Sequence, residues 1–178
     1  MNISAILSEH RLHINSRLEQ EVVTSFCSTT TQGGRKRLLQ DWFQGYIYAA
    51  TLGISKDKRV PFAKGEKVQK AQWSSNYLNQ YEFLLSHLLT RTDILVELNL
   101  LSSMADDTEA QTSEILLKTY LHEGAFNQTE FYKQVFEKLK NICDEFMNGG
   151  LEYLAEKKSN GSNFNDRLET LVEFLEPE

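Results

Sequence analysis

Histidine and cysteine are the side chains of this chain best suited to bind a metal ion or to act as a base or nucleophile, and it has four of the first and two of the second. His10 and His13 are three residues apart, so on a helix they would share one face, a spacing that can ligate a metal ion. A structural metal site usually has four side-chain ligands and a catalytic one about three, and the sequence does not identify the others. A solvated helix face is the favoured interpretation, and we expect no metal and no cofactor.

The other candidate residues also lack the setting of a catalytic site. His122-Glu123 is not part of an HExxH motif, no GxSxG is present, and neither Cys27 nor Cys143 lies in a known protease motif. Both cysteines are expected to be small buried hydrophobes, and His87, in a leucine-rich segment, a hydrogen-bonded residue at the edge of the core. We predict that the protein is not an enzyme. The alternative is a hydrolase or nuclease that uses His10, His13, His122 or Glu123.

Basic residues are concentrated in the first part of the chain. Residues 1–72 hold 11 Lys+Arg and 6 Asp+Glu, a net charge of +5, and residues 73–178 hold the remaining 8 and 19, a net charge of −11, so the whole chain sums to −6. Three cations follow Gly33-Gly34 at an expected helix start, where they oppose the helix macrodipole by up to about 1 kcal/mol each. A bound anion or an acidic partner would remove this conflict. The predicted binding residues are Arg35, Lys36, Arg37, Lys56, Lys58, Arg59, Lys64, Lys67 and Lys70.

Three counterparts fit these basic residues. Nucleic acid is one, because Lys and Arg neutralise phosphates and release counterions. An acidic protein surface is the second, and the acidic second part of the chain itself is the third. A net charge of −6 and a pI near 5.3 argue against broad affinity for nucleic acid. The residues would form one patch only if the segment that follows residue 53 folds back along the preceding helix.

The elements that must position these residues are predicted to be helical. The 178 residues, 40% apolar and 25% charged, are typical of one globular domain, residues 1–178. Apolar residues repeat at helical spacing between scattered glycines, which favours an all-α, single-domain helical bundle of about six to seven helices with a long basic loop. The apolar runs are far too short to cross a membrane, and the first residues lack the pattern of a signal peptide, so we expect a cytoplasmic protein.

The boundaries of these elements follow from caps and glycines. Gly53 is expected to follow the C-cap of the second helix, and Asn148-Gly149-Gly150 to end the longest one, which Asn127 and Glu130 open. A short extended piece is expected at Arg59-Val60. The expected helices span 3–26, 35–52, 74–90, 93–101, 106–123, 127–148, 151–158 and 166–175, and the expected loops and turns span 27–34, 54–72 and 159–163.

Aromatic residues lie on several sides of the helix expected over 35–52. They are Trp42, Phe43, Tyr46 and Tyr48, more than one buried stripe requires. Burial in the core is the favoured interpretation, because loops and neighbouring helices can cover a second face. The alternative is that part of this surface contacts a partner.

Two runs of sequence resemble a known group of proteins. The run FQGYIYAATLGI from Phe43 to Ile54, followed by Lys58-Arg59-Val60-Pro61, and the phrase Asn148-Gly149-Gly150-Leu151 are similar to small accessory proteins of bacterial DNA-phosphorothioation (Dnd) clusters and related anti-phage defence islands. The resemblance implies a helper that works beside DNA-handling or ATP-driven defence proteins, and it carries over no site residue. We therefore predict a non-catalytic accessory subunit of a defence complex that binds larger protein partners. The alternative is a DNA- or RNA-binding module that uses the basic residues of 35–37 and 56–70.

Overall fold

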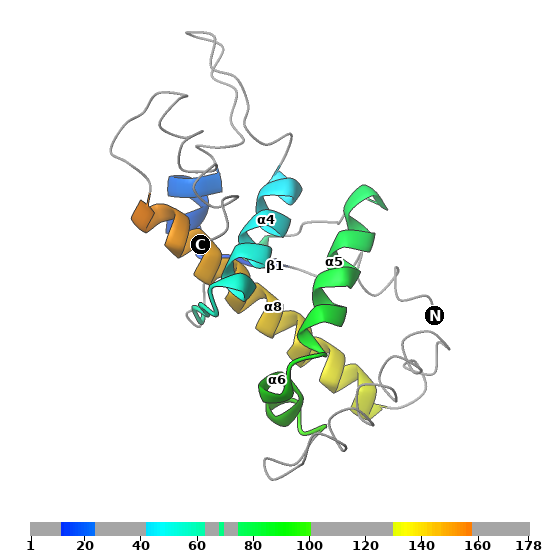
Figure 1. Ribbon diagram of the computed structural model, residues 1–178. Coiled ribbons are helices and arrows are strands. Elements are labelled where there is room, and N and C mark those ends of the chain that lie inside the picture. Colours follow the sequence, from blue (N-terminus) through cyan, green and yellow to red (C-terminus); the bar gives the residue numbers. More distant parts are fainter. Residues whose placement is uncertain (1–11, 24–41, 63–67, 70–74, 101–129, 158–178) are drawn as a thin grey trace, which may run out of the picture. The chain divides into compact units, whose positions relative to one another are not determined.

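The computed structural model describes residues 12–23, 42–62, 68–69, 75–100 and 130–157 (Figure 1). Of these residues 79% are helical, and the only strands among them are β1 (Leu12–His13) and β2 (Val68–Gln69). The predicted all-α class is therefore confirmed for the described residues. The bundle arrangement and the number of six to seven helices remain predictions.

Several predicted features lie outside the described residues. They are residues 3–11 and 24–26 of the first helix, the loop over 27–34, the start of the helix over 35–41, residues 63–67 and 70–72 of the basic loop, the helices over 106–123 and 166–175, the start of the longest helix at Asn127, and the turn over 159–163.

The chain divides into two compact units, each made of separate stretches of sequence. Unit 1 comprises Met1–Arg11 and Lys70–Cys143, and unit 2 comprises Leu12–Gln69 and Asp144–Glu178. Helix α8 (Glu130–Lys157) begins in unit 1 and continues into unit 2. The single domain over 1–178 stays a prediction.

Unit 2 begins with a strand, where the sequence predicts a helix over 3–26. Strand β1 pairs antiparallel with β2, with Leu12 opposite Gln69 and His13 opposite Val68. Leu12 and Ile14 are both buried while His13 between them is partly exposed, which is the alternation of a strand. The helix prediction is therefore wrong at residues 12–15.

The helical part of this segment begins directly after its N-cap residue, Asn15. The side-chain Oδ1 of Asn15 accepts hydrogen bonds from the backbone N–H groups of Arg17 (3.0 Å) and Leu18 (3.4 Å), so Asn15 is the N-cap of α2 (Ser16–Leu18). A π-helical turn, η1 (Glu19–Val23), continues it. The predicted helix is therefore confirmed over residues 16–23, which bury Leu18, Val22 and Val23.

Helix α4 (Trp42–Ser55) confirms the predicted helix over residues 42–52, but it does not end at Gly53. The backbone N–H of Lys58 donates to the carbonyl oxygen of Gly53 (2.9 Å), and that of Asp57 donates to the carbonyl of Ile54 (3.2 Å). Asp57 has a positive φ of 48°. These bonds form a Schellman motif with Asp57 in the position usually taken by glycine, so the prediction that Gly53 caps this helix is wrong.

Helix α8 runs for 28 residues without a break, so the predicted end at Asn148-Gly149-Gly150 and the separate helix over 151–158 are wrong. The glycines lie where another backbone approaches the helix. A Cβ atom on Gly150 would lie 1.9 Å from the carbonyl oxygen of Ala49, and one on Gly149 would lie 1.8 Å from that of Lys58. Glycine costs about 1 kcal/mol relative to alanine inside a helix, and close packing against α4 and the segment after it is what these two glycines make possible.

Unit 1 contains α5 (Ser75–Leu88), α6 (Thr92–Glu97) and the first part of α8. Helix α5 confirms the predicted helix over 74–90, and its stripe buries Tyr81, Leu84, Leu85 and Leu88. Helix α6 confirms the first part of the short helix predicted over 93–101, and it begins at Thr92 with Arg91 as its N-cap. The core of unit 1 also contains Ile94, Leu95, Val135, Phe136, Leu139, Ile142 and Cys143.

Within the part of the chain that the structure describes, no helix has both the length and the apolar character that crossing a membrane requires.

Candidate functional site

The basic residues predicted to bind a partner are only partly described. Lys56, Lys58 and Arg59 lie in the segment that ends α4 and follows it. The other predicted residues lie outside the described residues: Arg35, Lys36, Arg37, Lys64, Lys67 and Lys70. Whether the nine form one patch stays a prediction.

Carboxylates of α8 pair with Lys58. Its Nζ lies 2.8 Å from Oε1 of Glu156 and 3.1 Å from Oε2 of Glu152. The two glutamates are four residues apart, so they lie on one face of the helix. Burial alone would lower the pKa of Lys58, but the hydrogen bonds and charges of Glu156 and Glu152 outweigh it and raise that pKa above its ordinary value. Lys58 therefore stays charged and is neutralised within unit 2.

Arg59 and Lys56 also contact α8. The guanidinium of Arg59 forms an ion pair with Glu145, with Nε 3.1 Å from Oε2, and its Cζ lies 5.5 Å from the ring centroid of Phe146. The Nζ of Lys56 lies 5.9 Å from the ring centroid of Tyr153, within the range of a cation–π contact. The expected extended piece at Arg59-Val60 is not a strand in the structure, and the N–H of Val60 instead donates to the carbonyl of Glu145 (3.0 Å). Lys58 and Arg59 are thus paired with carboxylates of α8, and Lys56 lies over an aromatic ring of the same helix.

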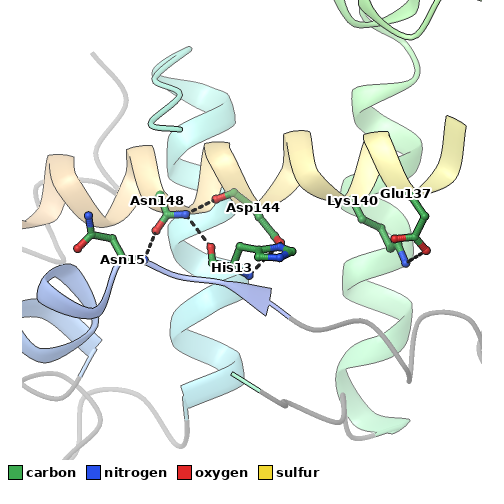
Figure 2. A network of polar contacts seen from close by, with 6 residues as sticks. All are labelled: His13, Asn15, Glu137, Lys140, Asp144 and Asn148. Atoms are coloured by element: carbon green, nitrogen blue, oxygen red, sulfur yellow. Dashed lines mark hydrogen bonds and ion pairs between the residues drawn. The ribbon is translucent and has the colours of Figure 1, made fainter. Parts of the chain in front are cut away.

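A second cluster joins α8 to strand β1 (Figure 2). Asp144 and Asn148 are one turn apart on α8 and are 1% and 0% exposed. Oδ2 of Asp144 accepts a hydrogen bond from the backbone N–H of His13 (3.0 Å) and lies 3.2 Å from Nδ1 of its ring. The amide of Asn148 donates to the carbonyl of His13 (2.8 Å) and accepts from the backbone N–H of Asn15 (2.9 Å). Two helix side chains therefore satisfy the backbone of an extended segment.

The His13 ring is held on two sides. It stacks on Phe62, with ring centroids 4.5 Å apart and an interplanar angle of 10°, and its Nδ1 faces Asp144. A carboxylate that orients an imidazole is the arrangement of a general base, but here the same carboxylate oxygen also binds the His13 backbone. The pair therefore acts as a clamp that holds β1 against α8, and its role is structural.

His13 lies in a strand, so the solvated helix face predicted for His10 and His13 is wrong at His13. The helical spacing on which the alternative metal role depended is absent there as well. His10, His122, Glu123 and Cys27 lie outside the described residues. Among the residues that the structure describes, no group of three or more His, Cys, Asp or Glu could hold a metal ion. Cys143 is buried, as predicted, whereas His87 is exposed and not at the edge of the core.

Of the four aromatic residues predicted to lie on several sides of this helix, Tyr46 confirms the favoured burial, Phe43 and Tyr48 are partly exposed, and the side chain of Trp42 lies outside the described part of the chain. Tyr46 is 1% exposed, and its hydroxyl donates to Oε1 of Glu19 (3.2 Å). The ring of Phe43 meets that of Tyr46 edge to face, with centroids 6.3 Å apart. Tyr48 is half-buried, and this burial raises its pKa to about 12.

A further feature was not singled out from the sequence. Phe83 on α5 is 71% exposed and is the one large hydrophobic side chain that is exposed among the described residues. The sequence carries a signal for it, since Phe83 precedes Leu84 and lies off the buried stripe of α5. The residues Asp144 and Asn148 were missed too, and their signal is a four-residue spacing, shared with buried Lys140, beside the apolar stripe of α8.

Buried Lys140 belongs to unit 1. Its Nζ pairs with the exposed Glu137 one turn earlier on α8 and lies 5.4 Å from the ring centroid of Phe136 (Figure 2). The long aliphatic stem is thus buried while the ammonium reaches a carboxylate at the surface.

The chain matches no protein-family model, no curated protein and no solved structure.

Proposed function

We propose that this protein is a non-catalytic accessory subunit that binds a larger protein partner, in a bacterial anti-phage defence complex of the cytoplasm. The observation that supports this proposal most is the exposure of Phe83 on a helix whose opposite face is buried. Burying a Phe side chain is worth about 1.5–3 kcal/mol, and an exposed aromatic residue is a common anchor of a protein interface. The defence setting depends on the resemblance of residues 43–61 and 148–151.

The two runs that carry this resemblance pack against each other in unit 2. Gly53 of the first run lies on the carbonyl of Phe146, and Gly150 of the second lies on the carbonyl of Ala49. Helix packing therefore accounts for the glycines at these two positions. The resemblance therefore concerns residues of the scaffold and not residues of a binding site.

Protein binding is preferred to nucleic-acid binding because of the ion pairs of Lys58 and Arg59. A phosphate backbone would have to displace Glu152 and Glu156 from the first and Glu145 from the second. Labelled single- and double-stranded DNA, titrated with the protein at two salt concentrations, tests the nucleic-acid alternative. Binding that weakens steeply with salt would favour that alternative.

The proposal itself is tested by co-purification. The protein, expressed together with the products of its neighbouring genes, is expected to elute with at least one of them in size-exclusion chromatography. Elution by itself in every pairwise and combined expression would contradict the proposed function.

A further inference from the structure

Asn148 and Gly149 form an Asn-Gly dipeptide inside α8, and the packing of unit 2 requires each of the two residues. The side-chain amide of Asn148 holds the backbone of the segment that contains β1, at His13 and Asn15. Position 149 excludes a side chain, because a Cβ atom on Gly149 would lie 1.8 Å from the carbonyl oxygen of Lys58. The fold therefore places in sequence the two residue types that together are most prone to deamidation.

Deamidation of an Asn-Gly dipeptide needs only the chain itself and water. The glycine backbone nitrogen attacks Cγ of the asparagine, which is easiest when the following residue has no Cβ atom. A bond forms between these two atoms and the bond from Cγ to Nδ2 breaks. The side-chain nitrogen leaves as ammonia with the proton that the glycine nitrogen loses, and a cyclic imide remains. Water then opens one of the two C–N bonds of the imide ring and gives aspartate or isoaspartate.

The folded protein blocks the first step at Asn148. In an α-helix the N–H of residue 149 is directed at the carbonyl of residue 145 and not at the side chain of residue 148. Asn148 is 0% exposed, and its amide donates to the carbonyls of His13 (2.8 Å) and Asp144 (2.9 Å) and accepts from the backbone N–H of Asn15 (2.9 Å) (Figure 2). The attack therefore requires that α8 loosens at this turn and that β1 leaves it.

The products of the reaction cannot restore these contacts. The carbonyls of His13 and Asp144 need a donor, and an aspartate carboxylate at position 148 offers acceptors alone. It would also lie one turn from the buried carboxylate of Asp144, and like charges in a buried site repel. Isoaspartate adds a methylene group to the main chain of α8, which disrupts the regular spacing of the helix hydrogen bonds.

We propose that Asn148-Gly149 is a deamidation site that reacts only when β1 separates from α8, and that the reaction makes this separation permanent. The rate at this site is then the rate of the unfolded chain multiplied by the fraction of time that the contact is open. The contact between β1 and α8 thus has a finite lifetime, set by its own opening.

The first test compares the folded and the urea-unfolded full chain, both kept at the same mildly alkaline pH. Deamidation of each asparagine is followed by peptide mapping and mass spectrometry. The second Asn-Gly of the chain, Asn160-Gly161, reports the intrinsic rate in urea. We expect both sites to react at similar rates in urea, and Asn148 to react about 100-fold or more slowly in the folded protein than in urea.

The second test loosens β1 without changing the dipeptide. His13→Ala removes the ring that faces Asp144 and stacks on Phe62, and His87→Ala makes the same change at an exposed position of α5 as the matched control. Loss of one internal hydrogen bond shifts an opening equilibrium roughly 3- to 10-fold, so we expect His13→Ala to speed deamidation of Asn148 in the folded protein by that factor. His87→Ala is expected to change the rate less than about 2-fold.

Several outcomes would overturn the proposal. They are a folded protein that reacts at Asn148 as fast as in urea, an unfolded chain that reacts at Asn160 but not at Asn148, and equal rates for His13→Ala and the wild type. If His13→Ala does not fold, the wild type in urea below its unfolding transition replaces it, and a rate at Asn148 that stays flat as urea rises contradicts the proposal. Protein deamidated at Asn148, separated by ion exchange, is expected to unfold at a lower urea concentration than the intact form. An unchanged midpoint would show that the contact re-forms.

Discussion

Gly150 of α8 and Ala49 of α4 approach so closely that a Cβ atom on the glycine would stand 1.9 Å from the alanine's carbonyl oxygen. The same contact is repeated one turn along α4, where a Cβ atom on Gly53 would stand 1.8 Å from the carbonyl oxygen of Phe146. Both obstacles are backbone atoms, which cannot move aside as the end of a side chain can. The separation of the two helices in unit 2 is therefore set by the absence of two side chains.

Gly150→Ala is expected to destabilise the protein, although helix propensity favours it. Alanine gains about 1 kcal/mol over glycine inside a helix, but overpacking costs typically about 1–3 kcal/mol and occasionally more. We expect a net loss of about 1–2 kcal/mol or more in the free energy of unfolding, measured by denaturant titration. Thr51→Ala, at an exposed position of α4, serves as the control and is expected to stay within about 0.5 kcal/mol. A gain in stability for Gly150→Ala would show that the helices are not in close contact.

Asn148→Ala is expected to cost about 2–4 kcal/mol of unfolding free energy. The change leaves the carbonyl of His13 and the backbone N–H of Asn15 without their partner on α8, and each buried polar group left unsatisfied costs about 1–3 kcal/mol. The same substitution at exposed Asn79 provides a control that removes an equal number of atoms. Equal stabilities of the two variants would contradict the role assigned to Asn148.

Stability is expected to decline at alkaline pH because of Tyr48. Burial raises the pKa of this hydroxyl to about 12 in the folded protein, against about 10 in an unfolded chain. A raised pKa contributes stability that is complete below pH 10 and is lost as the pH rises from about 10 to 12. The free energy of unfolding, followed across this range, is expected to fall more steeply for the wild type than for Tyr48→Phe. Parallel pH profiles for the two proteins would be inconsistent with a buried hydroxyl.

Replacement of Asn99 by alanine is expected to destabilise the protein more than replacement by glycine. At an ordinary helix position the order is the reverse. It has a positive φ of 58° and ends α6, with the N–H of Leu100 bonded to the carbonyl of Leu95 at 2.9 Å. Asn tolerates this conformation better than alanine does. We expect Asn99→Ala to lose about 1 kcal/mol and Asn99→Gly to change stability by less than about 0.5 kcal/mol, because relief of strain offsets the greater freedom of the unfolded chain. Thermal unfolding ranks the two variants, and a more stable alanine variant would refute the capping role.

Periodicity in the sequence located helices well but misplaced their ends. The stripes of α4 and α5 alternate every three and four residues, and that signal is local. Glycine is ambiguous by contrast, because a helix end and a close contact between backbones both require the lack of a Cβ atom. Gly53, Gly149 and Gly150 were all assigned to helix ends, and all three lie inside helices.

Strand β1 and its polar contacts could not be predicted for a different reason. The partners of His13 are distant in sequence: Val68 on β2, and Asp144 and Asn148 at separations of 131 and 135 residues. Without those partners, the apolar residues of 12–23 fit a helix as well as a strand. Charge left three counterparts open for the basic residues, and the structure pairs Lys58 and Arg59 with carboxylates of the chain's own acidic part.

The clamp on His13 also bears on how this chain avoids associating with itself. A strand that leaves its N–H and C=O groups open offers a template on which a strand of another molecule can add. At His13 both groups are occupied by side chains of a helix, which has no free backbone to extend the sheet. Asp144 and Asn148 therefore close one edge of this small sheet in the way that a covering helix protects larger ones, and loss of Asn148 would open a site for aggregation as well as lower stability.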